Sequence, residues 1–416
     1  MEFTDITCPM CGLACDDLRI RVDQAGINLQ EPSCALAERY FAAGWTDAAG
    51  SITARIDGKP VSFDDAIARA AELLAASRSA LVSGLMTDVD GARAALALAD
   101  RFGACIDHRD SEAQFRNLRV VQDSGWFNTT LTEVRNRASL VVIVGSNLLQ
   151  SAPRFGERVL APAGMFFEGR RKLVLLGEWN EDALAPELAD CEVSVIQVPL
   201  QKVAQAAGIL RMLCRGVAPA LGTDLPLDAL SALAQELKTT DYSTIAWSTA
   251  DFAFNHAELA VESLSELVRD LNEYTRCGGL PLGGGDGGIT SSQVCTWQSG
   301  FPPRTSFAAG HPEHDTIRYA ADRMLREGEA DLLVWLATLA PEAVPETSCP
   351  RIVIGHPATE LQTAANVFLP AAIPGIDQAG HCFRTDGVVA LPLRRLIEPR
   401  WRTARQIINQ LLEASC

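Results

Sequence analysis

The sequence lacks any apolar run of the roughly 18 residues that a helix needs to cross a bilayer. Its start, MEFTDITCPM, also lacks the basic and then apolar profile of a secretion signal. These two absences predict a cytoplasmic protein without a membrane-spanning segment. In that compartment, cysteines are expected to be reduced thiols or metal ligands rather than disulfides.

An excess of basic residues is missing as well. The 416 residues include 36 Lys and Arg against 52 Asp and Glu, which gives a net charge of −16. Nucleic acid is therefore not expected as a partner, because phosphate binding needs clustered Lys and Arg. Hydrophobic residues make up 48% of the chain, enough for two or three packed domains of about 150 residues each.

Motifs of nucleotide binding and hydrolysis do not accompany the predicted strand ends. Neither G-x-G-x-x-G nor G-x-x-x-x-G-K-[ST] follows these strands, and G-x-S-x-G and H-E-x-x-H are not found. His311 and His314, spaced i, i+3, are a weak metal signal and are more often loop polarity. The residues taken alone display no complete active site.

Cysteine is abundant, with 12 residues, and four of them gather in the first 34 positions. Cys8, Cys11 and Cys15 follow the spacing C-x2-C-x3-C, and Cys34 comes after them. Closely spaced thiolates suit a metal, and this spacing resembles an iron–sulfur pattern more than a zinc ribbon. The alternative is four free thiols in a compact N-terminal lobe.

From residue 61 onward, short apolar runs alternate with amphipathic helical patterns. Such runs are strands buried on both faces, so we expect an α/β fold with more than one doubly wound parallel sheet. Ser62 and Asp65 predict a capped helix start, and residues 18–30 predict a β-hairpin turning at Ala25-Gly26. The predicted strands are at 79–84, 104–107, 140–145, 172–177, 193–199, 243–248, 331–337 and 351–355.

The segment 281–315 is the most unusual part of the sequence. Five glycines lie within residues 283–288, followed by prolines and aromatic residues, which predicts a long pliable loop that approaches a ligand or a neighbouring chain. A structural crossover is the alternative. The expected domain division is 1–60, a small Cys-motif lobe with the hairpin; 61–275, α/β domains; 276–390, a long Gly/Pro loop plus an α/β domain; and 391–416, a C-terminal helix segment.

Several stretches together resemble the large B subunit of formylmethanofuran dehydrogenase, within the molybdopterin oxidoreductase superfamily. They occur in the family's order along the whole chain: CPMCGLACDD, SALVSG, VVIVGSN, LNEYTRCGGL, VCTWQSGFPP and NVFLPAAIPGIDQAGHCFRTDGV. The resemblance implies α/β units of molybdopterin-oxidoreductase type that bind a bis-pterin carrying molybdenum or tungsten. It also implies a [4Fe–4S] cluster on the N-terminal Cys quartet.

The sequence departs from this family at the metal ligand. Where the family has Cys followed by His, this chain has Ala113 and Gln114. Alanine has no metal-binding atom, and a soft metal centre needs a thiolate or selenolate there. Cys105, eight residues earlier and inside an apparent strand, is a poor substitute, and Glu178 at a strand end is a poor neighbour for a pyrophosphate. No catalytic residue and no molybdopterin-binding residue is therefore assigned.

A metal-free branch of the family fits these departures. The chain resembles the B subunit of the formyltransferase/hydrolase complex of methylotrophic bacteria. This resemblance implies a catalytically silent subunit in cytoplasmic formaldehyde oxidation, with an amidohydrolase-like zinc A subunit, a C subunit and a formyltransferase D subunit as partners. The Cys quartet would then hold a structural [4Fe–4S] cluster, a Zn²⁺ ion or nothing.

Two other interpretations remain open from the sequence. The chain could be an active molybdenum or tungsten dehydrogenase subunit that uses a displaced ligand. Alternatively, the old cofactor groove could bind the acidic arm of the one-carbon carrier, if Arg154, Arg304 and Arg384 line it.

Overall fold

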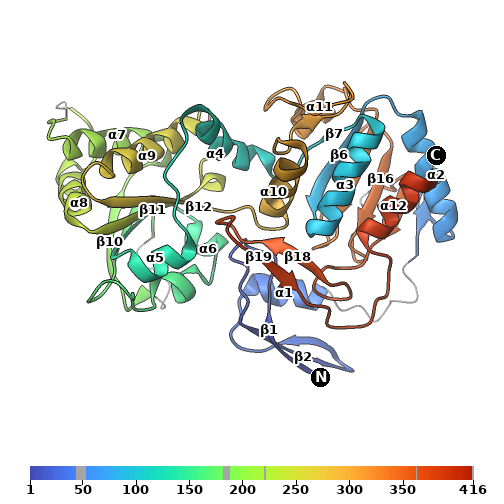
Figure 1. Ribbon diagram of the computed structural model, residues 1–416, viewed down its shortest axis with the longest axis horizontal. Helices are drawn as coiled ribbons and strands as arrows, with labels where there is room; N and C mark the ends of the chain where they lie inside the picture. Colours follow the sequence, from blue (N-terminus) through green and yellow to red (C-terminus); the bar gives the residue numbers. More distant parts are fainter. Residues whose placement is uncertain (44–52, 181–187, 220–221, 362, 415–416) are drawn as a thin grey trace. The chain divides into compact units, whose positions relative to one another are not determined.

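The computed structural model describes residues 1–43, 53–180, 188–219, 222–361 and 363–414 (Figure 1). By its internal packing the chain forms two compact units. Unit 1 combines Met1–Ser111 with Gly284–Cys416, and unit 2 is Glu112–Gly283. Unit 2 is thus inserted between two halves of unit 1. The four-segment division expected from the sequence follows changes in sequence pattern rather than packing, so it stays a prediction.

Unit 2 contains a five-stranded sheet in which all neighbouring strands are parallel. The outward order from β8 is β9 and β10 on one side and β11 and β12 on the other, so the order in which strands are added to the sheet reverses between β8 and β11. Every predicted apolar run in this part of the chain became a strand. The strands are β8 (Leu140–Gly145), β9 (Lys172–Gly177), β10 (Glu192–Gln197), β11 (Tyr242–Ser248) and β12 (Arg276–Leu282).

Helices cover both faces of this sheet (Figure 1). On one face, the apolar sides of α7 (Val203–Cys214), α8 (Leu227–Thr239) and α9 (Glu258–Leu271) form a buried core with the strands. The other elements are α4 (Ser111–Ser124), which crosses the boundary between the units, α5 (Leu131–Arg137), α6 (Leu148–Ser151), the π-helix η1 (Gly156–Leu160), and the 3₁₀ turns η4 (Leu200–Lys202) and η5 (Thr249–Asp251).

Unit 1 is built on a nine-stranded sheet whose five central strands are parallel. The order in which strands are added to this sheet reverses between β6 and β15, because β7 lies beside β6 on one side and β15, β16 and β17 follow on the other. In order across the sheet the strands are β14 (Glu313–His314), β13 (Thr305–Ser306), β7 (Cys105–Ile106), β6 (Ala80–Met86), β15 (Leu332–Ala337), β16 (Arg351–Gly355), β17 (Val367–Pro370), β4 (Arg55–Ile56) and β5 (Lys59–Pro60).

Helices α2 (Phe63–Ala76), α3 (Val89–Phe102) and α12 (Ala404–Ala414) pack their apolar sides on one face of this sheet. On the other face, α11 (Ala321–Arg326) contributes to a second core. The predicted cap of α2 is confirmed: the Ser62 hydroxyl accepts from Asp65 N at 3.1 Å and donates to the Asp65 carboxylate at 2.6 Å. Both sheets therefore confirm the predicted α/β fold with parallel sheets.

The N-terminal strands β1 (Glu2–Ile6), β2 (Leu18–Asp23) and β3 (Gly26–Leu29) form a separate antiparallel sheet, followed by α1 (Ala35–Ala43). The predicted hairpin is present, but its turn is one residue early. Asp23 pairs with Gly26, so Gln24 and Ala25 make the turn and Gly26 begins the return strand. The region shares its core with Leu339, Ile373 and Leu396, so it belongs to unit 1.

The prediction of one long loop over 281–315 was wrong in its middle. Residues Gly288–Ser299 form helix α10, bracketed by Gly287 and Gly300 in left-handed conformations with φ of +85° and +86°. Its polar and β-branched sequence has little helical periodicity, and packing against α3 and β6 decides its conformation. The antiparallel pair β18 (Gly380–Phe383) and β19 (Ala390–Leu393) also contacts α10. No helix among the described residues is long and apolar enough to cross a membrane.

Candidate functional site

The switch point of unit 2 is where an open parallel sheet ordinarily binds an anionic ligand, at the first turn after β8. Here that turn is filled by a carboxylate of the protein itself. The backbone N–H groups of Ser146 and Asn147 donate to the same Asp251 carboxylate oxygen, at 2.8 and 2.9 Å. A Cβ on Gly145 would lie 2.3 Å from that oxygen, so the glycine admits the carboxylate. The N–H groups that could hold a phosphate are thus already paired.

The next strand end carries a second acidic residue. Glu178 follows β9, and its carboxylate accepts from the backbone N–H of Leu200 at 3.3 Å. Beside it, Gln197 bonds both the N–H and the carbonyl of Trp179. Glu178 is therefore fixed at the strand end, and its negative charge is unfavourable to a pyrophosphate.

The switch point of unit 1 is a buried polar cluster at the ends of β6 and β15. Asp88 is fully buried, caps α3 by accepting from Gly91 N at 3.0 Å, and accepts from the Gln378 amide at 3.2 Å. Beside it, the Thr338 hydroxyl donates to the Thr87 hydroxyl at 3.0 Å. Burial raises the pKa of Asp88 to about 6. The cluster ties the start of α3 to the segment before β18.

His356 follows β16 at the same edge and is 1% exposed. Its Nδ1 accepts from Ala358 N at 3.1 Å, so Nε2 carries the proton, and it has no hydrogen-bond partner among the described residues. Burial, with Arg400 adding to the effect, lowers the pKa of His356 from 6.5 to about 4. The folded state therefore holds this imidazole neutral.

We expect His356 to make the protein acid-sensitive. Because its folded pKa lies below its unfolded value, its stabilising contribution is complete above about pH 6.5 and is lost as pH falls toward about 4. Between about pH 7.5 and pH 5 the loss is about 2 kcal/mol. Urea unfolding of His356→Gln should show a smaller pH dependence than wild type by that amount.

The stability of His356→Gln has to be compared with that of wild type at each pH, because buried carboxyls change the stability with pH in the opposite direction. Burial raises the pKa of Asp88 and of Asp286 to about 6, so both favour the folded state as pH falls. His256, whose side chain is 79% exposed, supplies the matched control. If His356→Gln and His256→Gln keep the same pH dependence as wild type, the assignment to His356 is wrong.

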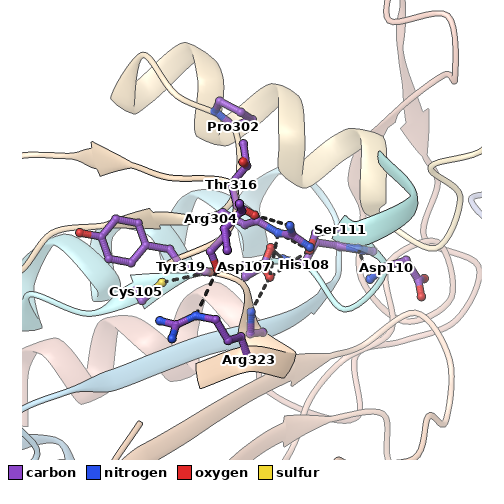
Figure 2. Close-up of polar contacts among 12 residues, drawn as sticks. Cys105, Asp107, His108, Asp110, Ser111, Pro302, Arg304, Thr316, Tyr319 and Arg323 are labelled. Atoms are coloured by element: carbon purple, nitrogen blue, oxygen red, sulfur yellow. Dashed lines mark hydrogen bonds and ion pairs between the residues drawn. The ribbon is translucent and has the colours of Figure 1, made fainter. Parts of the chain in front are cut away.

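A buried ion pair in unit 1 fixes the start of α4 (Figure 2). Asp107, at the end of β7, accepts from Ser111 Oγ at 2.9 Å and from Ala321 N at 2.8 Å, and lies 3.7 Å from the Arg304 guanidinium. Arg304 also donates to Ser111 Oγ at 3.1 Å and to the Thr316 carbonyl. Burial raises the pKa of Asp107 to about 7, against the lowering effect of Arg304. The network joins β7, α4 and the segment before α11.

Ala113 and Gln114 lie in the first turn of α4, just past Ser111, and both are half-buried. The side-chain amide oxygen and nitrogen of Gln114 are buried without a hydrogen-bond partner among the described residues. Cys105 does not lie free to replace a ligand: its thiol is buried in β7 and donates to the Tyr319 carbonyl at 3.6 Å. Burial raises the pKa of Cys105 far above the ordinary thiol value.

The four N-terminal cysteines lie near one another. Cys8 N donates to the Cys15 carbonyl at 2.9 Å, and burial together with repulsion from Cys11, Cys15 and Cys34 raises the pKa of the Cys8 thiol. The pKa of Cys11 is raised by burial to about 11. In the described part of the chain, however, no three Cys, His, Asp or Glu side chains form a group that could hold a metal ion. As arranged, the thiols are not a ligand set, and the metal site stays a prediction.

The glycine-rich segment approaches other parts of the same chain. A Cβ on Gly285 would lie 2.1 Å from the Met10 carbonyl, and one on Gly287 would lie 2.8 Å from Thr87 N. Arg109 anchors the segment by pairing with Asp286 at 3.3 Å, and it also pairs with Glu342 at 2.6 Å. The close approaches are to the Cys loop and the end of β6 of the same chain, and the predicted approach to a ligand or a neighbouring chain stays a prediction.

Residues 283–288 match G-x-G-x-x-G by letter, between β12 and α10, and this match was not predicted. The N–H groups of Gly288 and Ile289, which such a motif would present to a phosphate, bond instead to the Gly285 and Gly284 carbonyls, at 2.9 and 2.8 Å. Asp251 and the Asp88–Gln378 pair were also missed, because no local motif marks them.

The three arginines considered for an acidic ligand are each engaged within the chain. Arg154 is 3% exposed and bonds the Glu157 carboxylate at 2.7 and 2.9 Å. Arg304 lies in the Asp107 network, and Arg384 bonds Asp386 at 2.8 and 2.9 Å. Each positive charge is therefore balanced by a neighbouring carboxylate.

Comparisons with known proteins give relatives that match most of the chain, although no family model matches it. The B subunit of the tungsten-containing formylmethanofuran dehydrogenase 2 of Methanocaldococcus jannaschii is 27% identical over 413 residues, covering 95% of this chain and 94% of that protein. The corresponding protein of Methanococcus maripaludis is 24% identical with the same coverage.

The B subunit of the formyltransferase/hydrolase complex of Methylorubrum extorquens is 30% identical over 349 residues, covering 82% of this chain and 90% of that protein. One polypeptide in the crystal structure of the formyltransferase/hydrolase complex FhcABCD from Methylorubrum extorquens, in complex with methylofuran, matches with a TM-score of 0.75 and 26% identity. That match covers 87% of this chain and 98% of the other. The chain therefore belongs to the family that includes the B subunits of the formyltransferase/hydrolase complex and of formylmethanofuran dehydrogenase.

Proposed function

We propose that this chain is a non-catalytic, dehydrogenase-derived structural subunit of a cytoplasmic formyltransferase/hydrolase complex. The complex would release formate from formyl groups on a methanofuran-type carrier in one-carbon (formaldehyde) oxidation. Its partners would be a zinc-dependent amidohydrolase-like A subunit, a C subunit and a formyltransferase D subunit. Support comes from the similarity, over 82% and 87% of this chain, to the B subunit of Methylorubrum extorquens and to a polypeptide in the FhcABCD complex with methylofuran.

The parallel-sheet fold supports descent from a molybdopterin-type enzyme. The residues at the expected ligand position and at the turn after β8, however, do not fit a molybdenum or tungsten pterin. Ala113 offers no atom to molybdenum or tungsten, which need a soft ligand there. The observation that carries the proposal is the Asp251 carboxylate on the N–H groups of Ser146 and Asn147. A pterin dinucleotide phosphate at that turn would have to displace a fixed negative charge and would meet Glu178 at the end of the neighbouring strand.

The proposal leaves the N-terminal quartet with a structural role only. A [4Fe–4S] cluster or a Zn²⁺ ion on Cys8, Cys11, Cys15 and Cys34 would add folding free energy to unit 1 without redox work. The alternative of an active dehydrogenase needs a displaced ligand, and the buried, hydrogen-bonded Cys105 is unsuited to that role.

Isolation of the complex through a tag on this chain tests the proposal. We expect the tagged chain to copurify with the A, C and D subunits, and the complex to release formate from the formylated carrier. Ala113→Ser should leave that rate within about twofold of wild type, because a small side chain at a silent position touches no reacting atom. A chain that purifies alone and oxidises the formylated carrier with an artificial electron acceptor would contradict the proposal.

A further inference from the structure

Unit 2 carries a pair of neighbouring apolar side chains at its surface. Met165 and Phe166, between η1 and β9, are 74% and 64% exposed. Among the large apolar side chains of the described residues that are exposed, they are the only two consecutive in sequence. Neighbouring exposed apolar side chains rimmed by polar residues can mark a contact with another protein, whereas single ones are ordinary on a surface.

Local contacts hold this pair in one conformation. The backbone N–H groups of Met165 and Phe166 both donate to the Asn136 carbonyl, at 3.0 Å each. The Arg137 guanidinium lies over the Phe166 ring at 4.6 Å. Phe167 packs on Gly164, where a Cβ would lie 2.0 Å from the ring. The pair is therefore presented by a fixed loop and would lose little conformational entropy on binding.

A buried arginine holds this loop in place. Arg171 is 3% exposed, and its guanidinium lies 5.1 Å from the Phe167 ring. It donates to backbone carbonyls at the ends of α5 and η1. These acceptors are Val134, Arg135, Ala138, Val159, Leu160 and Pro162. One side chain thus joins the segments that flank Met165 and Phe166.

The surroundings of the pair are basic, in contrast to the rest of the chain. Residues 131–172 contain seven Lys and Arg but three Glu and no Asp, whereas the whole chain has a net charge of −16. Of these cations, Arg154 and Arg171 are buried, and Arg137 and Lys172 pair with Glu133 and Glu236. Arg135 and Arg170 are exposed and make no ion pair with a carboxylate among the described residues. Charge complementarity therefore favours a partner surface rimmed by carboxylates.

We propose that Met165 and Phe166 are the anchor by which this chain docks into an apolar, acid-rimmed pocket on another subunit of its complex. The inference rests on the proposed function. A second copy of this chain is disfavoured as the occupant, because the pair would contact a different, acidic surface of that copy. Such a contact is heterologous, so it would build a ring or an open chain of copies rather than a twofold dimer.

Reconstitution of the complex from the purified chain and the remaining subunits tests this inference. The double variant Met165→Ser/Phe166→Ser should bind roughly 30-fold more weakly than wild type, as for the loss of an interface hot spot. Its thermal unfolding should be unchanged, because both side chains are exposed. Tyr274→Ser is the matched control: Tyr274 is 48% exposed and lies 4.9 Å from Lys238 Nζ in a similar cation–π pair. The control should bind as wild type does.

A charge variant tests the acidic rim. Arg135→Glu should slow association, and the difference from wild type should shrink as salt is added. The inference is overturned if wild type assembles and the double variant assembles equally well, or if the double variant instead abolishes self-association of this chain. Failure of wild type to assemble with the other subunits would contradict the proposed function itself.

Discussion

Replacing Arg304 with Met is expected to lower the free energy of unfolding of unit 1 by about 3–5 kcal/mol. Arg304 and Asp107 are both almost fully buried, with side chains 4% and 2% exposed, and lie 3.7 Å apart. Methionine fills much of the same volume, but it leaves the Asp107 carboxylate without its cation. The bonds from Arg304 to Ser111 and to the Thr316 carbonyl are lost at the same time. Urea unfolding well above pH 7, where the Asp107 carboxyl is ionised, measures the loss.

A double-mutant cycle shows whether the ion pair itself carries the effect. Asp107→Asn removes the charge but also alters the acceptor of Ala321 N, so it has a cost of its own. With both substitutions, we expect a loss smaller than the sum of the two single losses by at least about 1 kcal/mol. Strict additivity, or a loss below about 1 kcal/mol for Arg304→Met, would show that the pair does not stabilise unit 1.

Gly287→Ala is expected to cost about 3–4 kcal/mol, from left-handed strain and from a steric clash. Gly287 has φ of +85°, and its Cβ would lie 2.8 Å from Thr87 N and 2.9 Å from the Leu85 carbonyl oxygen. All of these neighbours are backbone at the end of β6, so relief needs movement of the strand end or of α10. Thermal or urea unfolding of unit 1 provides the measurement.

Gly300 separates the two contributions. It ends the same helix with φ of +86°, and no atom lies within 4 Å of where its Cβ would be. Gly300→Ala should therefore show the conformational strain alone, about 1–2 kcal/mol. If Gly287→Ala and Gly300→Ala destabilise the chain equally, the close contact between the glycine-rich segment and β6 is not tight in solution.

The parallel sheets were predictable because their strands are apolar on both faces, and such runs are visible without any tertiary information. β8, β9 and β16 begin and end where the sequence placed them. The cap at Ser62 was predictable for the same reason, since its partner lies three residues away. α10 was not, because its conformation depends on packing rather than on its own periodicity.

Less of the candidate site could be predicted from the sequence. Asp251 and Gln378 bond residues about 100 and 290 positions away, and nothing in their local sequence announces those partners. The interruption of unit 1 by unit 2 depends on contacts between Met1–Ser111 and Gly284–Cys416, which no linker composition marks. Ala113 could be identified as the replacement for a metal ligand only through the resemblance to a family, since an alanine in a helix is otherwise ordinary.

The metal and pterin content of the intact complex tests the central claim most directly. The complex is purified through this chain, shown to release formate, and analysed for molybdenum, tungsten and the fluorescence of oxidised pterin. With Ala113 at the ligand position and Asp251 on the turn after β8, we expect neither metal above background and no pterin, with hydrolase activity intact. Stoichiometric molybdenum or tungsten together with pterin would contradict the account of a non-catalytic subunit.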